Sequence, residues 1–190
     1  MFKYFKLHEV KKMKSMNRLS AISQGVIVTK ADSLNREYDI FLSHCYSDAQ
    51  NLSSEFDDVV SLFQSLGLSV YIDWKNDDNL REDAITADNA DTLRKRLKNS
   101  RCLLYLTSEN SPDSKWMPWE LGYMDGLSKK VCVFPLLISN ETFMGQEYLG
   151  LYPQIGYVKP PIFTLLSIDY QCLWVRENHK LMHFDSWLDV

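Results

Sequence analysis

The sequence predicts an α/β domain built on a largely parallel sheet. Four short apolar runs typical of buried strands occupy residues 38–44, 68–72, 102–106 and 131–134. Segments with hydrophobic residues at helical spacing separate these runs. Strands that alternate with helices form right-handed crossovers, so we expect parallel strands with helices on both faces of the sheet.

The first predicted unit is a strand, a helix and a second strand. Residues 38–44 are apolar and rich in strand-forming side chains, as expected for a strand buried on both faces. Apolar residues then recur three and four positions apart from Leu52 to Leu66, and Gly67 stands where a helix would end. Residues 68–72 form the second strand, which should pair with the first in parallel.

The second half of the pattern begins with a polar loop over residues 75–83, which is long enough to be functional. A helix centred on Leu93 follows and is basic near its C-terminal end, where cations suit the helix dipole. A third strand over residues 102–106 leads into another helix. A fourth strand over residues 131–134 is expected to stop at Pro135.

The pattern is weaker beyond Ser139. Two apolar runs, at residues 162–166 and 172–175, are candidate strands, and residues 184–188 are a candidate closing helix. These segments would complete a domain that spans residues 37–190.

The composition indicates one folded domain preceded by a basic extension. The 190 residues are 45% hydrophobic, which is enough for one core, and we place that core in residues 37–140. Residues 1–30 contain seven Lys or Arg and one acid, whereas the remaining 160 residues contain 14 basic and 24 acidic side chains. An acidic body argues against nucleic-acid binding. We expect the extension, residues 1–36, to be solvated or to dock on that body; a partner or an anionic surface is the alternative.

The sequence also indicates a compartment. No apolar run approaches the roughly 20 residues of a membrane helix, and no apolar segment of a signal peptide follows the first lysines. The four cysteines lack the paired spacing of a metal site. We therefore expect a cytoplasmic protein with reduced, buried thiols, no membrane contact and no metal.

Glu120 is the strongest candidate for a functional side chain. It follows the third predicted strand at the start of a helix, and ligands of open α/β sheets bind at the carboxyl ends of strands. Pro118 is tolerated only in a first helical turn, which places the helix start near Ser114 or Met117. Trp116 lies four residues before Glu120 and would share its helical face. The alternative is that Glu120 offsets the helix dipole and that the aromatic residues are core.

Other chemistries are disfavoured. His179 and His183 are spaced as on a metal-binding helix face, but no third ligand stands nearby in the sequence. Cys45 and His44 are neighbours that would point to opposite faces of a strand. The chain lacks both G-x-G-x-x-G and G-x-x-x-x-G-K-[ST], which argues against a classical dehydrogenase or kinase.

Three segments have a distinctive order and spacing: residues 38–44, residues 68–73 and the stretch from Ser111 through Trp116 to Glu120. Together they resemble the Toll/interleukin-1 receptor (TIR) domain family, in particular bacterial stand-alone TIR-like proteins of the Thoeris anti-phage type. The resemblance implies a flavodoxin-like, mostly parallel sheet of about five strands with helices on both faces.

The resemblance also implies an activity. In many members of the family, one glutamate cleaves the nicotinamide–ribose bond of NAD, and the matching residue is Glu120. NAD is then a substrate, and no cofactor is implied. The loop after the second strand, residues 73–83 here, helps to form the cleft and mediates assembly in this family. The residues expected to bind substrate are Ser43, His44, Asp73, Trp74 and Trp116.

This chemistry needs few groups. Ordinary glycosidases protonate the leaving oxygen, whereas the nicotinamide of NAD is already cationic and leaves as a neutral base. Glu120 would stabilise the oxocarbenium-like ribose that forms as the bond breaks. If water is excluded, the product is a cyclic or conjugated ADP-ribose instead of ADP-ribose, and in the Thoeris type such a product signals to a separate effector.

Two other functions are compatible with the sequence. The chain could be a non-catalytic module that assembles with other TIR domains, or as a homo-oligomer, through residues 74–83. It could also be a nucleoside deoxyribosyltransferase-like enzyme, which breaks an N-glycosidic bond in a related fold. We favour NAD cleavage because Trp116 is expected beside Glu120 in an open cleft.

Overall fold

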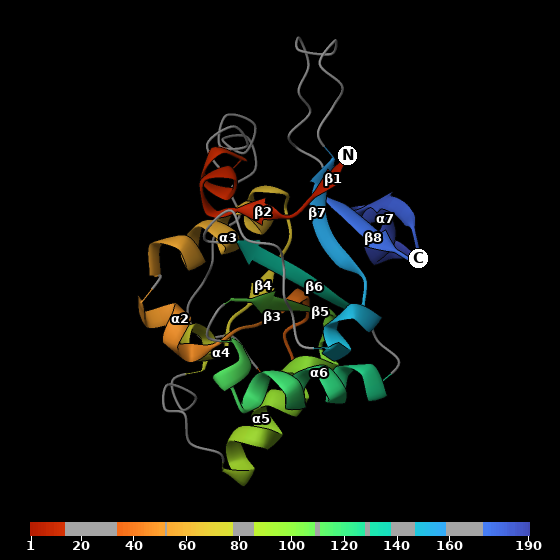
Figure 1. The fold of residues 1–190 in the computed structure, drawn as a ribbon. Coiled ribbons are helices and arrows are strands. Elements are labelled where there is room, and N and C mark those ends of the chain that lie inside the picture. Colours follow the sequence, from red (N-terminus) through yellow and green to blue (C-terminus); the bar gives the residue numbers. More distant parts are fainter. Residues whose placement is uncertain are drawn as a thin grey trace.

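The computed structural model shows one sheet with helices on both faces (Figure 1). It describes residues 1–13, 34–51, 53–77, 86–108, 111–127, 130–137, 147–158 and 173–190. The strands are β1 (Phe2–Lys3), β2 (Phe5–Lys6), β3 (Tyr38–Ser43), β4 (Val70–Tyr71), β5 (Ser100–Thr107), β6 (Lys130–Leu137), β7 (Gln154–Val158), β8 (Trp174–Glu177) and β9 (Lys180–His183). The helices are α2 (Tyr46–Asn51), α3 (Ser53–Ser65), α4 (Asp73–Asn76), α5 (Ala87–Lys98), α6 (Trp116–Gly126) and α7 (Phe184–Asp189), with 3-10 turns η2 (Ser111–Asp113) and η3 (Glu147–Leu151).

The strand order confirms the expected fold. The described strands form one sheet in the order β4-β3-β5-β6-β7-β8-β9. Pairing is parallel from β4 to β7 and antiparallel between β7, β8 and β9. The parallel part has the flavodoxin-like order, in which ligands bind outside the carboxyl ends of the strands. No helix in the described part of the chain is long and apolar enough to cross a membrane.

The sheet is buried on both faces by two apolar clusters. One cluster packs α3 and α7 against the sheet, and the other packs α5 and α6 against the opposite face. Alternate residues of β5 enter the two clusters: Cys102, Leu104 and Leu106 face the first, and Leu103 and Tyr105 face the second. This double burial explains why β5 is an unbroken apolar run in the sequence.

The N-terminal segment is part of the sheet, although the sequence suggested an extension ahead of a domain that starts at residue 37. β2 pairs with β6 in parallel, and β1 pairs with β7 in antiparallel orientation. Phe5 is fully buried, and its ring stacks on that of Phe134 with centroids 5.4 Å apart. A Cβ at Gly156 would collide with the Lys3 carbonyl oxygen, so only glycine allows β1 to approach β7 this closely.

β6 continues through Pro135, so the prediction that this strand would stop there was wrong. The Val133 N–H donates to the Pro153 carbonyl oxygen on the β7 side, at 2.8 Å. The backbone nitrogen of Pro135, two residues further along the strand, therefore points to the same β7 side. β6 pairs with β7 at Val133 and with β2 only from Leu136 onward. The missing N–H of Pro135 thus falls in a gap of the ladder, where it costs no hydrogen bond.

Other predicted elements have different outcomes. The helix after the first strand is present as α2 and α3, and Gly67 follows it with a left-handed φ of +82°. The closing helix is confirmed as α7, whereas β7 and β9 were not predicted. The candidate strand at residues 162–166 lies outside the described residues. His179 lies in a turn with φ 68°, and His183 ends β9, so the two histidines do not share a helix face.

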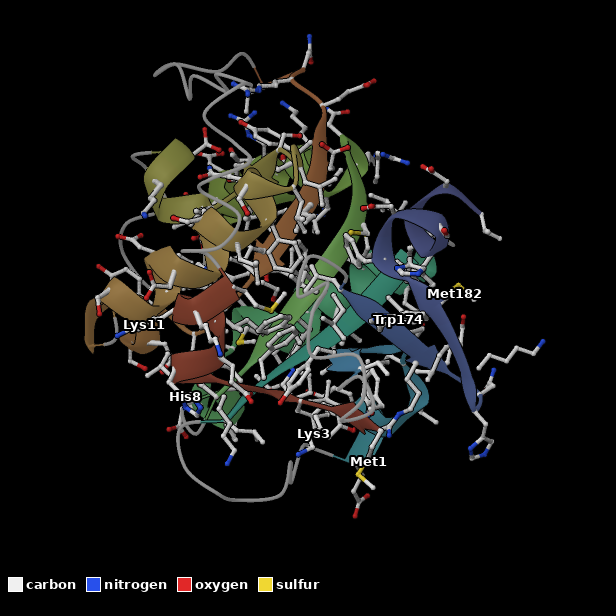
Figure 2. The ribbon with its side chains drawn as sticks, turned by 90° about the horizontal axis from the view of Figure 1, so that it is seen from above. Met1, Lys3, His8, Lys11, Trp174 and Met182 are labelled. Carbon is white, nitrogen blue, oxygen red and sulfur yellow. The ribbon has the colours of Figure 1, made fainter. Side chains whose placement is uncertain are left out.

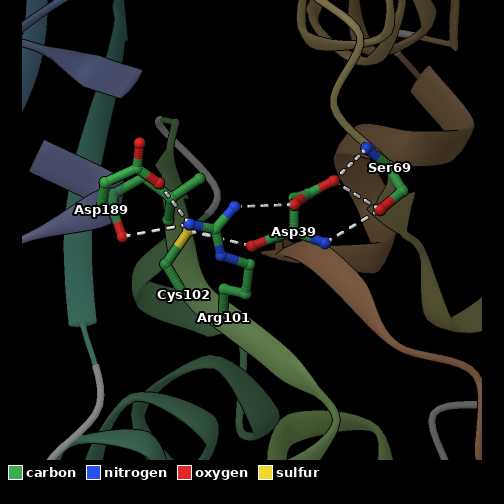
Figure 3. Close-up of polar contacts among 6 residues, drawn as sticks. Asp39, Ser69, Arg101, Cys102 and Asp189 are labelled. Carbon is green, nitrogen blue, oxygen red and sulfur yellow. Dashed lines mark hydrogen bonds and ion pairs between the residues drawn. The ribbon is translucent and has the colours of Figure 1, made fainter. Parts of the chain in front are cut away.

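A polar network ties the C-terminal helix to the amino ends of the parallel strands (Figure 3). The Arg101 guanidinium donates to Asp39 Oδ1 at 3.1 Å and to Asp189 Oδ1 at 2.6 Å. Asp39 Oδ2 also accepts hydrogen bonds from the N–H and the hydroxyl of Ser69, at 2.8 and 2.7 Å. Burial alone would raise the pKa of Asp39, but the hydrogen bonds from Ser69 and Arg101 outweigh it and hold that pKa below its usual value.

Candidate active site

Glu120 and Ser43 meet at the carboxyl edge of the sheet. Glu120 lies on α6 and is 3% exposed, and Ser43 is the last residue of β3. The Ser43 hydroxyl donates to Glu120 Oε2 at 2.6 Å. Pro118 lies in the first turn of α6, as predicted, because its missing N–H would have no intrahelical partner there. The hydrogen bond joins the end of one central strand to the helix that follows its neighbour β5.

The surroundings of Glu120 favour its neutral form. Burial, together with the negative charge of Asp73, raises the pKa of Glu120 from 4.5 to about 8, and the hydrogen bond from Ser43 offsets only part of this rise. The side chain is therefore mostly protonated at neutral pH in the free protein. Strongly perturbed carboxyl groups are frequent at functional sites, although burial also produces them elsewhere.

Asp73, whose charge acts on Glu120, also lies close to His44. Asp73 begins α4, and its Oδ1 lies 3.7 Å from His44 Nε2. His44 Nδ1 lies 3.1 Å from the Leu42 carbonyl oxygen and must donate to it, because a carbonyl can only accept. The imidazole also packs on the Phe56 ring with centroids 4.6 Å apart. These contacts fix the His44 ring, while the Asp73 side chain stays partly exposed.

The aromatic residues of α6 form a half-buried row. Trp116 meets Trp119 edge to face at 5.3 Å between ring centroids, and Trp119 stacks on Tyr123 at 5.5 Å. Trp116 precedes Glu120 by one helical turn, as the spacing predicted. The backbone of Trp74 lies in α4, and its side chain is outside the described residues.

Three polar residues near this edge were not among the site residues expected from the sequence. Asp48 follows β3, is 4% exposed and accepts a hydrogen bond from the Ser108 hydroxyl, which follows β5. The Ser108 N–H in turn donates to the Ser111 hydroxyl at 2.6 Å. These bonds join the segment that follows Ser43 to the segment that leads to Glu120. An acid after one strand and a serine-rich stretch after another were the available signals.

The structure brings four of the six expected site residues into one cluster: Glu120, Ser43, His44 and Asp73. Trp116 lies one turn away. The sequence favoured an open cleft, but Glu120 is almost fully covered in this conformation. Three cavities outlined by described residues lie elsewhere. Residues 78–85, which follow α4 in the sequence, are outside the described part of the chain. The arrangement is that of a doubly wound α/β protein with a buried glutamic acid, Glu120, at the carboxyl edge of its sheet.

No family model matches the chain, but its sequence is similar to those of several known proteins. A probable 3′ cyclic ADP-D-ribose synthase, ThsB′ of Bacillus cereus strain MSX-D12, is 38% identical over 157 residues, covering 81% of this chain and 77% of that protein. A putative cyclic ADP-D-ribose synthase, TIR2 of Cytobacillus dafuensis, is 32% identical over 105 residues, or 55% of this chain and 26% of that protein. A probable 2′ cyclic ADP-D-ribose synthase, TcpO of Methanobrevibacter olleyae, is 29% identical over 147 residues, or 76% and 40%. The chain belongs to the TIR-domain family that includes ThsB′, which confirms the resemblance in the three segments.

Proposed function

We propose that this protein cleaves the nicotinamide–ribose bond of NAD and closes the remaining ADP-ribose into a cyclic product. The observation that supports it most directly is Glu120, a buried carboxyl group bonded to Ser43 at the carboxyl edge of the sheet. The 38% identity to ThsB′, a probable 3′ cyclic ADP-D-ribose synthase, supports the cyclic product.

Glu120 is proposed as the catalytic residue. The cationic nicotinamide ring of bound NAD favours the ionised form of a nearby acid, so binding would lower the raised pKa of Glu120 and yield the carboxylate. As the bond breaks, its electron pair moves to the nicotinamide nitrogen and positive charge develops on the ribose. A carboxylate within a low-dielectric site stabilises that charge more in the transition state than in the ground state.

The neighbouring residues are proposed to bind the substrate. Ser43 holds the Glu120 carboxyl group, and the partly exposed carboxylate of Asp73 can accept hydrogen bonds from ribose hydroxyls. His44 is a donor at the same edge, and Trp116 and Trp74 are proposed to stack on the flat rings of NAD. A water-poor site favours capture of the ribosyl cation by a group of the same nucleotide, which loses a proton as the ring closes.

The cellular role follows from the family. We propose that the cyclic nucleotide is a signal in anti-phage defence, made in the cytoplasm and read by a separate effector protein. Assembly into a homo-oligomer is proposed to complete the site, because residues 73–77 carry Asp73 and lie at its border.

The direct test is incubation of the purified protein with NAD, with nicotinamide release followed by chromatography and the second product by mass spectrometry. We expect a product that is lighter than ADP-ribose by one water. Glu120→Gln and Glu120→Ala should abolish nicotinamide release, whereas Asp125→Asn, which removes an exposed acid from the same helix, should retain it. Unchanged turnover in a Glu120 variant would refute the proposal. Silence of the wild type at high protein concentration would favour the assembly module, and base exchange between nucleosides would indicate a deoxyribosyltransferase.

A further inference from the structure

A buried arginine joins α5 to the residue that follows α4. The last turn of α5 contains Lys95, Arg96 and Lys98; both lysines are exposed, whereas Arg96 is fully buried. Its guanidinium forms a bidentate ion pair with Asp77, in which Nε donates to Oδ2 at 2.9 Å and Nη2 donates to Oδ1 at 3.0 Å. The Tyr71 hydroxyl of β4 donates to the same Oδ2 at 2.8 Å. We call Arg96, Asp77 and Tyr71 the Arg96 clamp.

The clamp keeps its charges in the folded protein. The Arg96 guanidinium lies over the rings of Tyr38 and Tyr71, at 5.9 and 5.2 Å from their centroids, within the range of cation–π contacts. Burial alone would lower the pKa of Arg96, but the hydrogen bonds and the charge of Asp77 outweigh it and raise that pKa above its usual value. A guanidinium binds a carboxylate through two parallel N–H groups, which a lysine cannot do. The clamp therefore fixes the direction of the Asp77 side chain as well as its distance.

α4 depends on contacts outside itself, because a helix of four residues is not stable alone. Its N-cap residue, Ile72, provides no side-chain hydrogen bond. Lys75 pairs with Asp57, but both side chains are partly exposed, and such ion pairs contribute little. The Asp77 N–H closes α4 by donating to the Asp73 carbonyl oxygen at 2.8 Å. The buried clamp therefore holds the helix at its C-terminal end.

The clamp lies on the same face of the sheet as Glu120. Tyr71 belongs to the apolar cluster that packs α5 and α6 against the sheet, and Glu120 is on α6. The helical residues 7–13, where Figure 2 labels His8 and Lys11, pack with α3 on the opposite face. The clamp and the Glu120 cluster are thus not separated by the sheet.

We infer that Arg96 is a positioning residue for the proposed NAD site: it holds Asp77 and thereby fixes where α4 places Asp73. The inference rests on the proposed function, in which Asp73 accepts hydrogen bonds from ribose hydroxyls. Asp73 begins α4 and lies 3.7 Å from His44, so a shift of this short helix moves a group at the border of the site. Buried ion pairs often add no net stability over apolar side chains of the same size. What this pair provides is a fixed geometry.

The first readout is local opening of α4 in the full chain. Tyr71→Phe removes one hydrogen bond to Asp77 and keeps the buried ring, and Arg96→Lys keeps the charge but loses the bidentate pair. Hydrogen exchange of the Asp77 amide, measured by NMR relative to the Leu104 amide of the central strand β5, should become about tenfold faster or more in both variants. Lys95→Met removes a charge from the same turn at an exposed position and should leave this ratio unchanged. If Arg96→Lys does not fold, Tyr71→Phe still gives the answer.

The second readout is the kinetics of nicotinamide release from NAD. A misplaced substrate-binding group raises KM, whereas a smaller folded fraction lowers kcat alone. At about pH 9, above the pKa of about 8 of Glu120, an altered ionisation of this acid does not contribute. Tyr71→Phe and Arg96→Lys should then raise KM about tenfold with little change in kcat. Asp73→Asn removes the group that the clamp positions, so adding Tyr71→Phe to it should raise KM little further.

The outcomes separate this inference from the proposed function. Faster exchange of the Asp77 amide together with a raised KM supports the inference. Unchanged exchange overturns it, as does faster exchange with an unchanged KM or an equal effect of Lys95→Met. If the wild type releases no nicotinamide, the proposed function fails, and the exchange measurement alone decides whether Arg96 positions α4.

Discussion

Replacing Glu120 with glutamine is expected to stabilise the fold while it abolishes the proposed activity. In the folded protein, burial and the charge of Asp73 raise the pKa of Glu120 from 4.5 to about 8. At about pH 7 the Glu120 carboxyl group is ionised in the unfolded chain and protonated in the folded chain. This difference lowers the free energy of unfolding by about 3 kcal/mol, because one pKa unit corresponds to ~1.4 kcal/mol. Glutamine is neutral in both states, has nearly the same shape and can accept the Ser43 hydrogen bond, so it avoids this cost.

The direction of the pH dependence follows from the raised pKa. Below about pH 4.5 both states are protonated, so wild type and Glu120→Gln should have similar free energies of unfolding. As pH rises from about 4.5 to about 8, the wild type loses stability relative to the variant, and the difference levels off near 5 kcal/mol as an upper estimate. For a domain of this size, the neutral-pH difference corresponds to roughly 10 °C in the unfolding midpoint.

The assay is urea denaturation of wild type and Glu120→Gln across this pH range, followed by tryptophan fluorescence. Asp125→Asn is the matched control, because it removes an exposed acid from the same helix and should show little pH-dependent gain. A Glu120→Gln protein that is less stable than wild type at neutral pH would contradict the reasoning. A stability difference that does not vary with pH would contradict it as well.

Three further predictions concern the site and the fold. Asp73→Asn removes a negative charge that raises the pKa of Glu120. In wild type we expect kcat/KM to rise with pH near 8, and in the variant this rise should occur at lower pH. A pH profile of kcat/KM that is the same in both proteins would exclude this coupling. Arg101→Met should lower the free energy of unfolding by only about 1 kcal/mol in urea denaturation, and less at high salt, because its ion pairs are partly exposed; a salt-independent loss would show that packing dominates. Gly156→Ala places a Cβ against the Lys3 backbone and should cost about 1–3 kcal/mol, with faster tryptic cleavage at the N-terminal lysines; unchanged cleavage would show that β1 can shift without detaching.

Much of the central fold could be predicted because its signals are local. β5 is buried on both faces, so its residues form an unbroken apolar run, and α5 places Leu93 and Leu97 on one buried side at helical spacing. Pro118 restricted the start of α6 for a reason that lies in the backbone alone. Such signals depend on near neighbours in the chain and need no knowledge of distant contacts.

The sheet edges were harder to predict because their partners are distant in sequence. β1 and β2 are two residues each and gain hydrogen bonds only where β6 and β7 diverge. Phe5 belongs to the core because Phe134 and Tyr157, both distant from it in the chain, pack against its ring. Pro135 was expected to end a strand, and only the gap between two pairing partners explains why it does not.

The sequence by itself determined which acid to examine, because Glu120 follows a buried strand at a helix start in a stretch that resembles one family. The tertiary structure alone decided the state of that acid. Ser43 and Asp73 are remote from Glu120 in the chain, and their hydrogen bond and charge act on it only because parallel strands end at the same edge of the sheet. A pKa depends on burial and on charges in space, and neither is encoded by near neighbours in the sequence.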